Sequence, residues 1–116
     1  MGIGIKPTIV IPGSVTYINV DAFRNNRLEY VVMSRNVTNI GESAFRNNRL
    51  TSIEIPNSVE YIGDDAFRSN RLLSLVIPAS VESIGDNSFR DNRITSANVP
   101  NTTEVGEDAF RDNPLN

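Results

Sequence analysis

The spacing of the five phenylalanines constrains the fold of this chain more than any other feature of its sequence. They stand at positions 23, 45, 67, 89 and 110, so the successive intervals are 22, 22, 22 and 21 residues. A fixed period of this length is typical of architectures in which each repeat packs on the next. The sequence therefore predicts a stacked array, because one copy carries too few apolar side chains to close a core alone.

Other positions keep the same register as the phenylalanines. Leucine or isoleucine recurs at Leu28, Leu50, Leu72, Ile94 and Leu115, and a second apolar column runs through Ile18, Ile40, Ile62, Ile84 and Val105. We divide the chain into units 7–28, 29–50, 51–72, 73–94 and 95–115, the last one residue shorter between Pro100 and Phe110. These units predict a single domain over residues 1–116.

The third unit illustrates the expected local structure. Ile53 and Ile55 alternate with polar residues as in a short strand, which Pro56 ends because proline donates no ladder hydrogen bond. A second, weaker extended segment is expected at 58–62, followed by a turn at Gly63 that uses glycine's freedom at positive φ. Residues 64–68 then predict one turn of α- or 3-10 helix, with carboxylates at its start and an arginine at its end.

The composition excludes several classes of chemistry. The chain has no cysteine, histidine or tryptophan, which removes disulfides, thiolate or imidazole metal sites and every histidine-dependent triad. Its acidic pairs recur as equivalent copies without calcium-loop spacing, so we predict no metal, no cofactor and no catalytic residue. With 11 basic and 14 acidic residues the net charge is −3, and no nucleic-acid partner is expected.

The order of these columns resembles a known family. The run from Leu50 to Phe67, with its Ile-Pro-x-Ser-Val and Ile-Gly-x-x-Ala-Phe blocks, is similar to the BspA-like (Treponema pallidum type) leucine-rich repeats of bacterial surface proteins. The resemblance implies an α/β-type repeat solenoid, a right-handed leucine-rich-repeat coil with short parallel strands and short α or 3-10 turns. It also implies a secreted or cell-surface setting, with a protein or glycan on a cell surface as the partner.

The first strand of each unit is expected to line the concave face, and its outward residues vary from copy to copy. On a rigid repeated scaffold, such variation is how a solenoid recognises a partner, although strand propensity alone also favours valine there. We expect this partner-binding face at Val10, Tyr30, Val32, Ser52, Glu54, Ser74, Val76, Ser96 and Asn98.

Two arginine columns form a candidate anion-binding stripe. They are Arg24, Arg46, Arg68, Arg90 and Arg111, and Arg27, Arg49, Arg71 and Arg93. Planar guanidinium groups suit oxyanions, but acid-then-base pairs four residues apart, such as Asp64 and Arg68, favour a purely structural pairing. Both interpretations remain open.

Asparagine follows each phenylalanine by three residues, at Asn26, Asn48, Asn70, Asn92 and Asn113. Its side chain can pair turn amides and carbonyls, so we expect a structural ladder parallel to the phenylalanine column.

The function that best fits these features is a non-enzymatic module for protein–protein or cell-surface interaction. The alternatives are a structural spacer or stalk segment of a larger surface protein, and a weak polyanion-binding arginine stripe. No apolar run reaches the ~20 residues of a membrane span, and residues 1–6 do not resemble a signal peptide, so a soluble chain is expected. Phe110 and Leu115 at the end predict an open apolar face and end-to-end association of copies, or truncation from a longer array.

Overall fold

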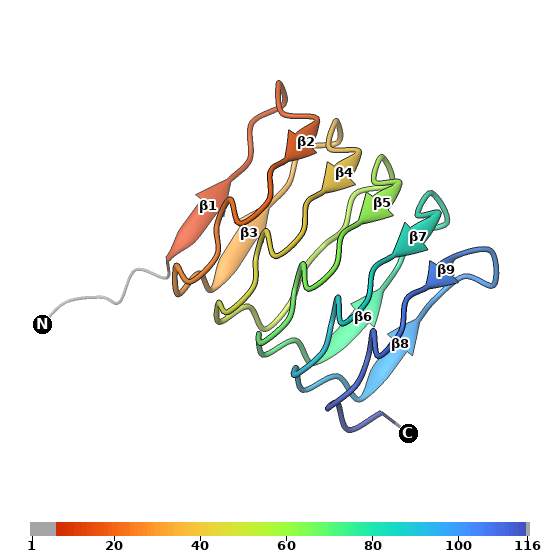
Figure 1. Cartoon of the computed structure of the whole chain (residues 1–116). Helices are drawn as coiled ribbons and strands as arrows, with labels where there is room; N and C mark the ends of the chain where they lie inside the picture. The colour runs from red at the N-terminus through yellow and green to blue at the C-terminus, as the bar shows by residue number, and fades with distance from the viewer. Residues whose placement is uncertain (1–6, 116) are drawn as a thin grey trace, which may run out of the picture.

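The computed structural model describes residues 7–115, which wind into a coil whose turns stack along one axis (Figure 1). Its short strands all pair in parallel. They are β1 (Thr8–Val10), β2 (Tyr17–Ile18), β3 (Tyr30–Val32), β4 (Asn39–Ile40), β5 (Tyr61–Ile62), β6 (Ser74–Val76), β7 (Ser83–Ile84), β8 (Ser96–Asn98) and β9 (Glu104–Val105). No described residue belongs to a helix of the length and apolarity that a membrane span requires, and the expectation for residues 1–6 lies outside the described part.

One side of the coil is a continuous five-stranded sheet in the order β2-β4-β5-β7-β9. Equivalent residues of successive units pair, for example Asn39 with Tyr61. The last unit is one residue shorter, and the pairing of Ser83 with Glu104 keeps its strand in the same alignment. The segment expected to be the weaker strand therefore forms the unbroken ladder.

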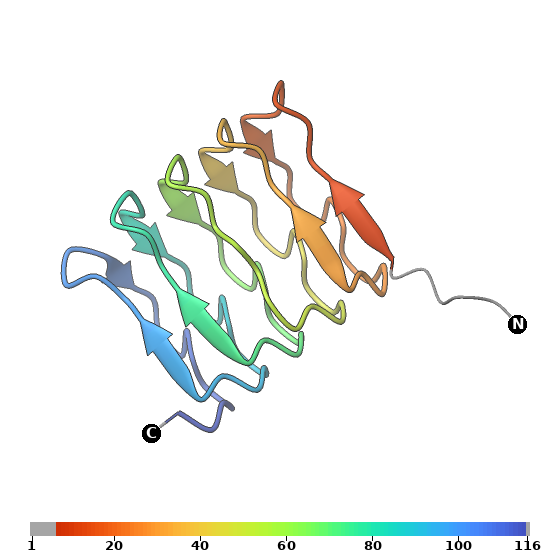
Figure 2. The same cartoon turned by 180° about the vertical axis from the view of Figure 1, so that it is seen from behind.

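The opposite side is interrupted. β1 pairs with β3 and β6 with β8, but Ser52–Ile55, which runs between the two pairs, makes no backbone hydrogen bond to any described residue (Figure 2). The predicted strand at Ile53 and Ile55 is therefore wrong. Glu54 occupies the outward position held by valine on both sides, and glutamate favours a strand less than valine does.

The predicted helical turns are also absent from residues 7–115, so the described coil is built from strands and turns rather than an α/β combination. Asp65 and Ser69 have φ values of 58° and 61°, in the left-handed region where a right-handed helix cannot continue. The amide of Phe67 donates to the Ser88 carbonyl at 2.8 Å, and that of Ser69 donates to the Arg90 carbonyl at 2.9 Å. Amides that a helix would pair internally thus bond to the next coil.

Hydrogen bonds between coils run in both senses along the axis. In the turns, Phe67 donates to the following coil, whereas beside the continuous sheet Gly63 donates to the Ile40 carbonyl of the preceding coil at 2.8 Å. Each coil is therefore held to its neighbours along two separate lines of bonds.

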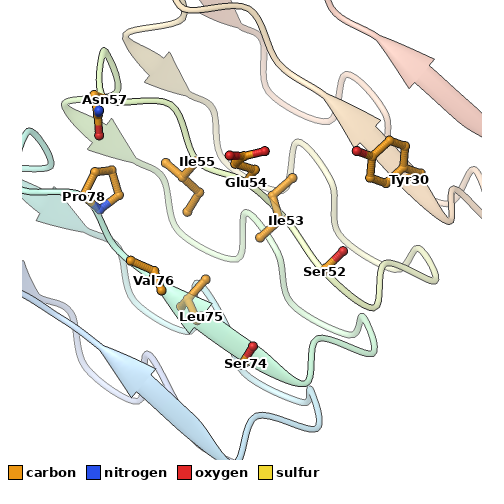
Figure 3. Close-up of a pocket in the computed structure, with 10 residues that line it drawn as sticks. All are labelled: Tyr30, Ser52, Ile53, Glu54, Ile55, Asn57, Ser74, Leu75, Val76 and Pro78. Carbon is orange, nitrogen blue, oxygen red and sulfur yellow. The ribbon is translucent and has the colours of Figure 1, made fainter.

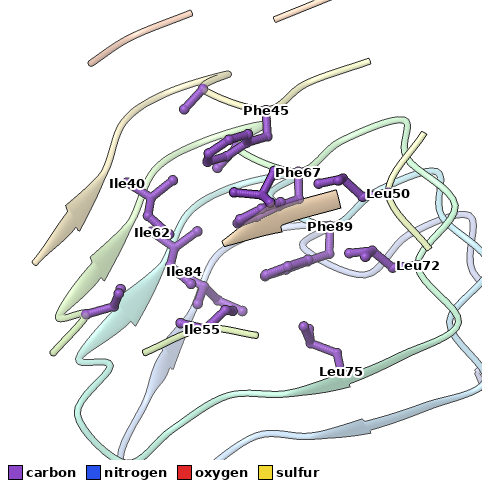
Figure 4. Close-up of a cluster of buried hydrophobic side chains, with 14 of the residues drawn as sticks. Ile40, Phe45, Leu50, Ile55, Ile62, Phe67, Leu72, Leu75, Ile84 and Phe89 are labelled. Atoms are coloured by element: carbon purple, nitrogen blue, oxygen red, sulfur yellow. The ribbon is translucent and has the colours of Figure 1, made fainter. Parts of the chain in front are cut away.

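The phenylalanine rings form one stack through the centre of the coil (Figure 4). Neighbouring ring centroids are 5.3 to 5.7 Å apart and the ring planes differ by 6° to 13°. Phe45, Phe67 and Phe89 are fully buried, while Phe23 and Phe110 at the two ends are half-buried. The isoleucine column of the continuous sheet and the leucine column pack beside the stack, so the buried core runs the length of the coil.

The recurrent glycine has a different role from the one expected. No described glycine has a positive φ. Instead, a Cβ atom on Gly63 would lie 2.7 Å from the Glu42 amide nitrogen and 2.9 Å from the Gly41 carbonyl carbon. The backbone of one coil rests on the next here, which also explains why the first unit can carry Asn19: no described coil precedes it.

Candidate functional site

We define the strand face as the nine residues expected to bind a partner, and all nine are exposed. Its apolar members are prominent: the exposed fractions are 67% for Val10, 48% for Tyr30, 40% for Val32 and 66% for Val76. They lie on β1, β3 and β6, so the fold brings residues from separate units onto one surface (Figure 2).

The interruption of the sheet leaves a hollow of about 530 Å³ in the middle of the strand face (Figure 3). Tyr30 lies on one side of it, Ser74 and Val76 lie on the other, and the Ser52–Ile55 segment crosses between them. The unpaired amides and carbonyls of this segment are available to a partner, because no described residue binds them. The hollow therefore combines exposed apolar side chains with free backbone donors and acceptors.

The arginine columns differ in their partners. In the first column Arg24 pairs with Asp21 at 3.3 Å, Arg68 with Asp65 at 3.1 Å and Arg111 with Asp108 at 3.6 Å. These acids lie three residues before the arginine, so the predicted pairing four residues apart is wrong. The reason is the left-handed residue in each turn, which replaces helical spacing.

Two arginines of this column depart from the pattern. Arg90 pairs with Asp112 of the next coil at 3.2 Å, and Arg46, with a serine three residues before it, has no ion pair among residues 7–115. The second column is exposed at Arg27, Arg49, Arg71 and Arg93, and none of these four is ion-paired to a described residue.

The asparagine column lies inside the turns. Asn70 accepts a hydrogen bond from the Leu50 amide at 3.1 Å and donates to the carbonyls of Phe45 and Phe67 at 2.9 and 3.1 Å. Asn48, Asn92 and Asn113 make equivalent bonds. The side chain of Asn26 in the first unit is exposed and, among residues 7–115, donates only to the Arg24 carbonyl. One amide group thus joins two coils.

We expect Asn70→Ala to lower the free energy of unfolding by about 2 kcal/mol, because it orphans the buried Leu50 amide and removes one of the two donors to each of the Phe45 and Phe67 carbonyls. Urea denaturation measures the loss. The matched control is Asn26→Ala, whose side chain is exposed and should change stability by less than about 0.5 kcal/mol. An unchanged midpoint for Asn70→Ala would show that water satisfies the orphaned groups.

The acidic residues that open the turns also serve as acceptors. A carboxylate oxygen of Asp64 accepts the Asp86 amide, and one of Asp86 accepts the Glu107 amide, each at 2.8 Å. Among residues 7–115 no group of three or more such side chains could hold a metal ion. The role that the structure shows for Asp64 and Asp86 is to accept a backbone hydrogen bond from the next coil.

Sequence reasoning missed two features of the continuous sheet. Tyr17 and Tyr61 are exposed on its outer side, and the neighbouring Glu82 carboxylate, as hydrogen-bond partner and as a negative charge, raises the pKa of Tyr61. Ser58 and Ser80 donate to the carbonyls of Val37 and Val59 at 2.7 and 2.8 Å, forming a second polar ladder. The recurrence of Ser-Val two residues after Pro12, Pro56 and Pro78 was the available signal for that ladder.

Comparisons with known proteins agree with this architecture. The family model described as BspA type leucine rich repeat region (6 copies) matches residues 6–116. The crystal structure of a leucine-rich repeat protein from Bacteroides ovatus ATCC 8483 is similar, with a TM-score of 0.61, 25% sequence identity and coverage of 91% of this chain. The match covers 35% of that protein's chain, so the present chain spans about a third of its length. No curated protein matches the sequence. The match to the family over residues 6–116, together with the parallel coil of 22-residue repeats, shows that the chain belongs to the BspA-type leucine-rich-repeat family.

Proposed function

We propose that the chain is a non-enzymatic interaction module that binds a protein partner through the strand face. The observation that carries this proposal is the hollow at the sheet interruption, where Tyr30 and Val76 flank a segment whose backbone has no partner among the described residues. Exposed apolar groups beside free backbone donors suit an extended protein segment, which needs both kinds of contact. The repeated core behind this surface supports recognition by a preformed shape.

Family membership supports a repeat module, and the secreted or cell-surface setting implied by the resemblance is part of this proposal. We also propose that the five predicted units act as one domain, since the phenylalanine stack runs without a break from Phe23 to Phe110. Phe110 is half-buried and Leu115 is exposed, so association of copies through this end stays a prediction, to be measured by light scattering at increasing concentration.

Tyr30→Ser combined with Val32→Glu should reduce partner capture at least tenfold, because it removes the exposed aromatic group and places a charge on the apolar part of the strand face. Binding would be measured on an array of purified extracellular-matrix proteins and glycans. Both positions are exposed, so the melting temperature should stay within about 2 °C of the parent.

The matched control is Tyr61→Ser, which removes an exposed tyrosine from the continuous sheet on the other side of the coil. It should leave capture unchanged. If the double variant captured partners as well as the parent, the strand face would not be the binding surface; if the parent captured none, the spacer alternative would replace the proposal.

A further inference from the structure

The second arginine column contains a segment of uncompensated positive charge. The side chains of Arg27, Arg49 and Arg71 are exposed and have no hydrogen-bond or ion-pair partner among residues 7–115. Most members of the first column, by contrast, each meet a carboxylate. Within residues 7–115, four of the five arginines in the first column thus meet a carboxylate, whereas no arginine of the second column does.

These three arginines line a common hollow. Its volume is about 450 Å³, and its walls are Asn25, Arg27, Asn47, Asn48, Arg49 and Arg71, with no acidic residue among them. The phenylalanine rings of the coils that carry these arginines stack at 5.3 to 5.4 Å, so the three arginines come from directly successive coils. Equal charges that line one hollow repel each other, so an anionic ligand that bridges them would gain from all three.

Two asparagines add neutral polar groups to the same hollow. Asn47 Nδ2 donates to Asn25 Oδ1, and this bond leaves Asn25 Nδ2 as a donor and Asn47 Oδ1 as an acceptor with no partner among residues 7–115. Hydroxyl groups can both donate and accept, so they match this pair.

The charge pattern changes at the fourth arginine of the column. The repeat position that is Asn25 in the first unit and Asn47 in the second is Ser69 in the third and Asp91 in the fourth. The Asp91 carboxylate accepts a hydrogen bond from the Ser69 hydroxyl at 3.0 Å. Arg93 follows Asp91 by two residues and does not line the hollow. The hollow without an acidic residue thus ends at Arg71.

We propose that Arg27, Arg49 and Arg71, together with the amides of Asn25 and Asn47, form a binding site for a linear sulfated polysaccharide. Guanidinium groups bind sulfate oxygens through paired donors, and the asparagine amides match sugar hydroxyls. The lining has no aromatic side chain on which a nucleobase could stack, which disfavours single-stranded nucleic acid. This surface lies apart from the strand-face hollow, which shares none of its lining residues, so the two proposals stand or fall separately.

The test is titration of the intact chain with size-defined heparin oligosaccharides in 50 mM salt, followed by isothermal calorimetry. Neutral dextran should not bind. Inorganic polyphosphate and an oligothymidine of similar charge should bind more weakly than the sulfated oligosaccharide. Increasing salt should weaken binding with a logarithmic slope of about −2, as expected for three contacted charges.

Arg49→Gln should raise the dissociation constant about fivefold, which is the upper range for loss of one exposed charge contact. The matched control is Arg93→Gln, which removes the same charge from the same column beside Asp91 and should change the constant less than twofold. Asp91→Asn should strengthen binding about twofold, because it copies the asparagine of the earlier units and removes a negative charge two residues from Arg93.

Equal weakening by Arg49→Gln and Arg93→Gln would overturn the proposal, since it would mean diffuse attraction without a site. Tighter binding of polyphosphate or oligothymidine would assign the site to another polymer, and no binding in 50 mM salt would remove it. The variants lie on exposed positions, and an unchanged thermal transition would show that each remains folded.

Discussion

Replacing Phe67 with alanine should lower the free energy of unfolding by about 4 kcal/mol, the largest effect we expect from a single substitution in this chain. The ring is fully buried and lies between Phe45 and Phe89, with centroid distances of 5.3 Å on both sides. Removal leaves a cavity that neighbouring coils cannot fill, because hydrogen bonds to both neighbours fix their separation. Urea denaturation followed by circular dichroism measures the loss.

Phe23→Ala is the matched control for this prediction. Its ring has one stacking neighbour and is half-buried, so the loss should be about half as large. Equal losses at the two positions would mean that burial within the stack does not determine the stability of the coil.

Gly63→Ala should cost about 3 kcal/mol, because the new methyl group meets backbone and not a flexible side chain. The nearest atoms are the Glu42 amide nitrogen at 2.7 Å and the Gly41 carbonyl carbon at 2.9 Å. Relief of this overlap requires two coils to move apart, which lengthens the bond from the Gly63 amide to the Ile40 carbonyl. The thermal midpoint of the purified variant gives the measurement.

Gly13→Ala tests the same change at a position with room. A Cβ atom there has its nearest neighbour at 3.7 Å, the Asn36 side-chain nitrogen, which is ordinary contact. We expect no loss at Gly13, and a similar loss at both glycines would argue for backbone entropy instead of coil contact as the cause.

The repeat itself could be predicted because a stacked coil places equivalent residues in equivalent surroundings. The phenylalanine positions define the period, and the Asn70 position could be assigned to a turn because its amide can pair both amides and carbonyls. The structure places these residues in continuous columns between coils.

The local conformation could not be predicted from the same residues. Asp64 to Arg68 carries the charge order of a short helix, yet Asp65 adopts positive φ because bonding between coils outweighs one isolated helical turn. The glycine at position 63 suggested a positive φ, but its φ is not positive. Glycine is needed there because a Cβ atom would overlap the backbone of the preceding coil. In both cases contacts with the neighbouring coil decide the outcome.

The candidate sites show the same division. Exposure of Tyr30 and Val32 followed from strand alternation, but the interruption at Glu54 depends on both neighbouring units at once. The sequence also could not separate the arginine column that pairs with aspartate from the one that does not, because the turn geometry determines which acids are within reach.

The two senses of the hydrogen bonds between coils bear on how such a protein can be lengthened. Peptide dipoles that all point along one axis add up, as they do in an α-helix, and leave partial charges at the two ends. Here the bond from Phe67 to Ser88 points along the axis in one direction and that from Gly63 to Ile40 in the other, so their dipoles oppose each other. Added repeats therefore do not build up a dipole along the axis as added turns of an α-helix do.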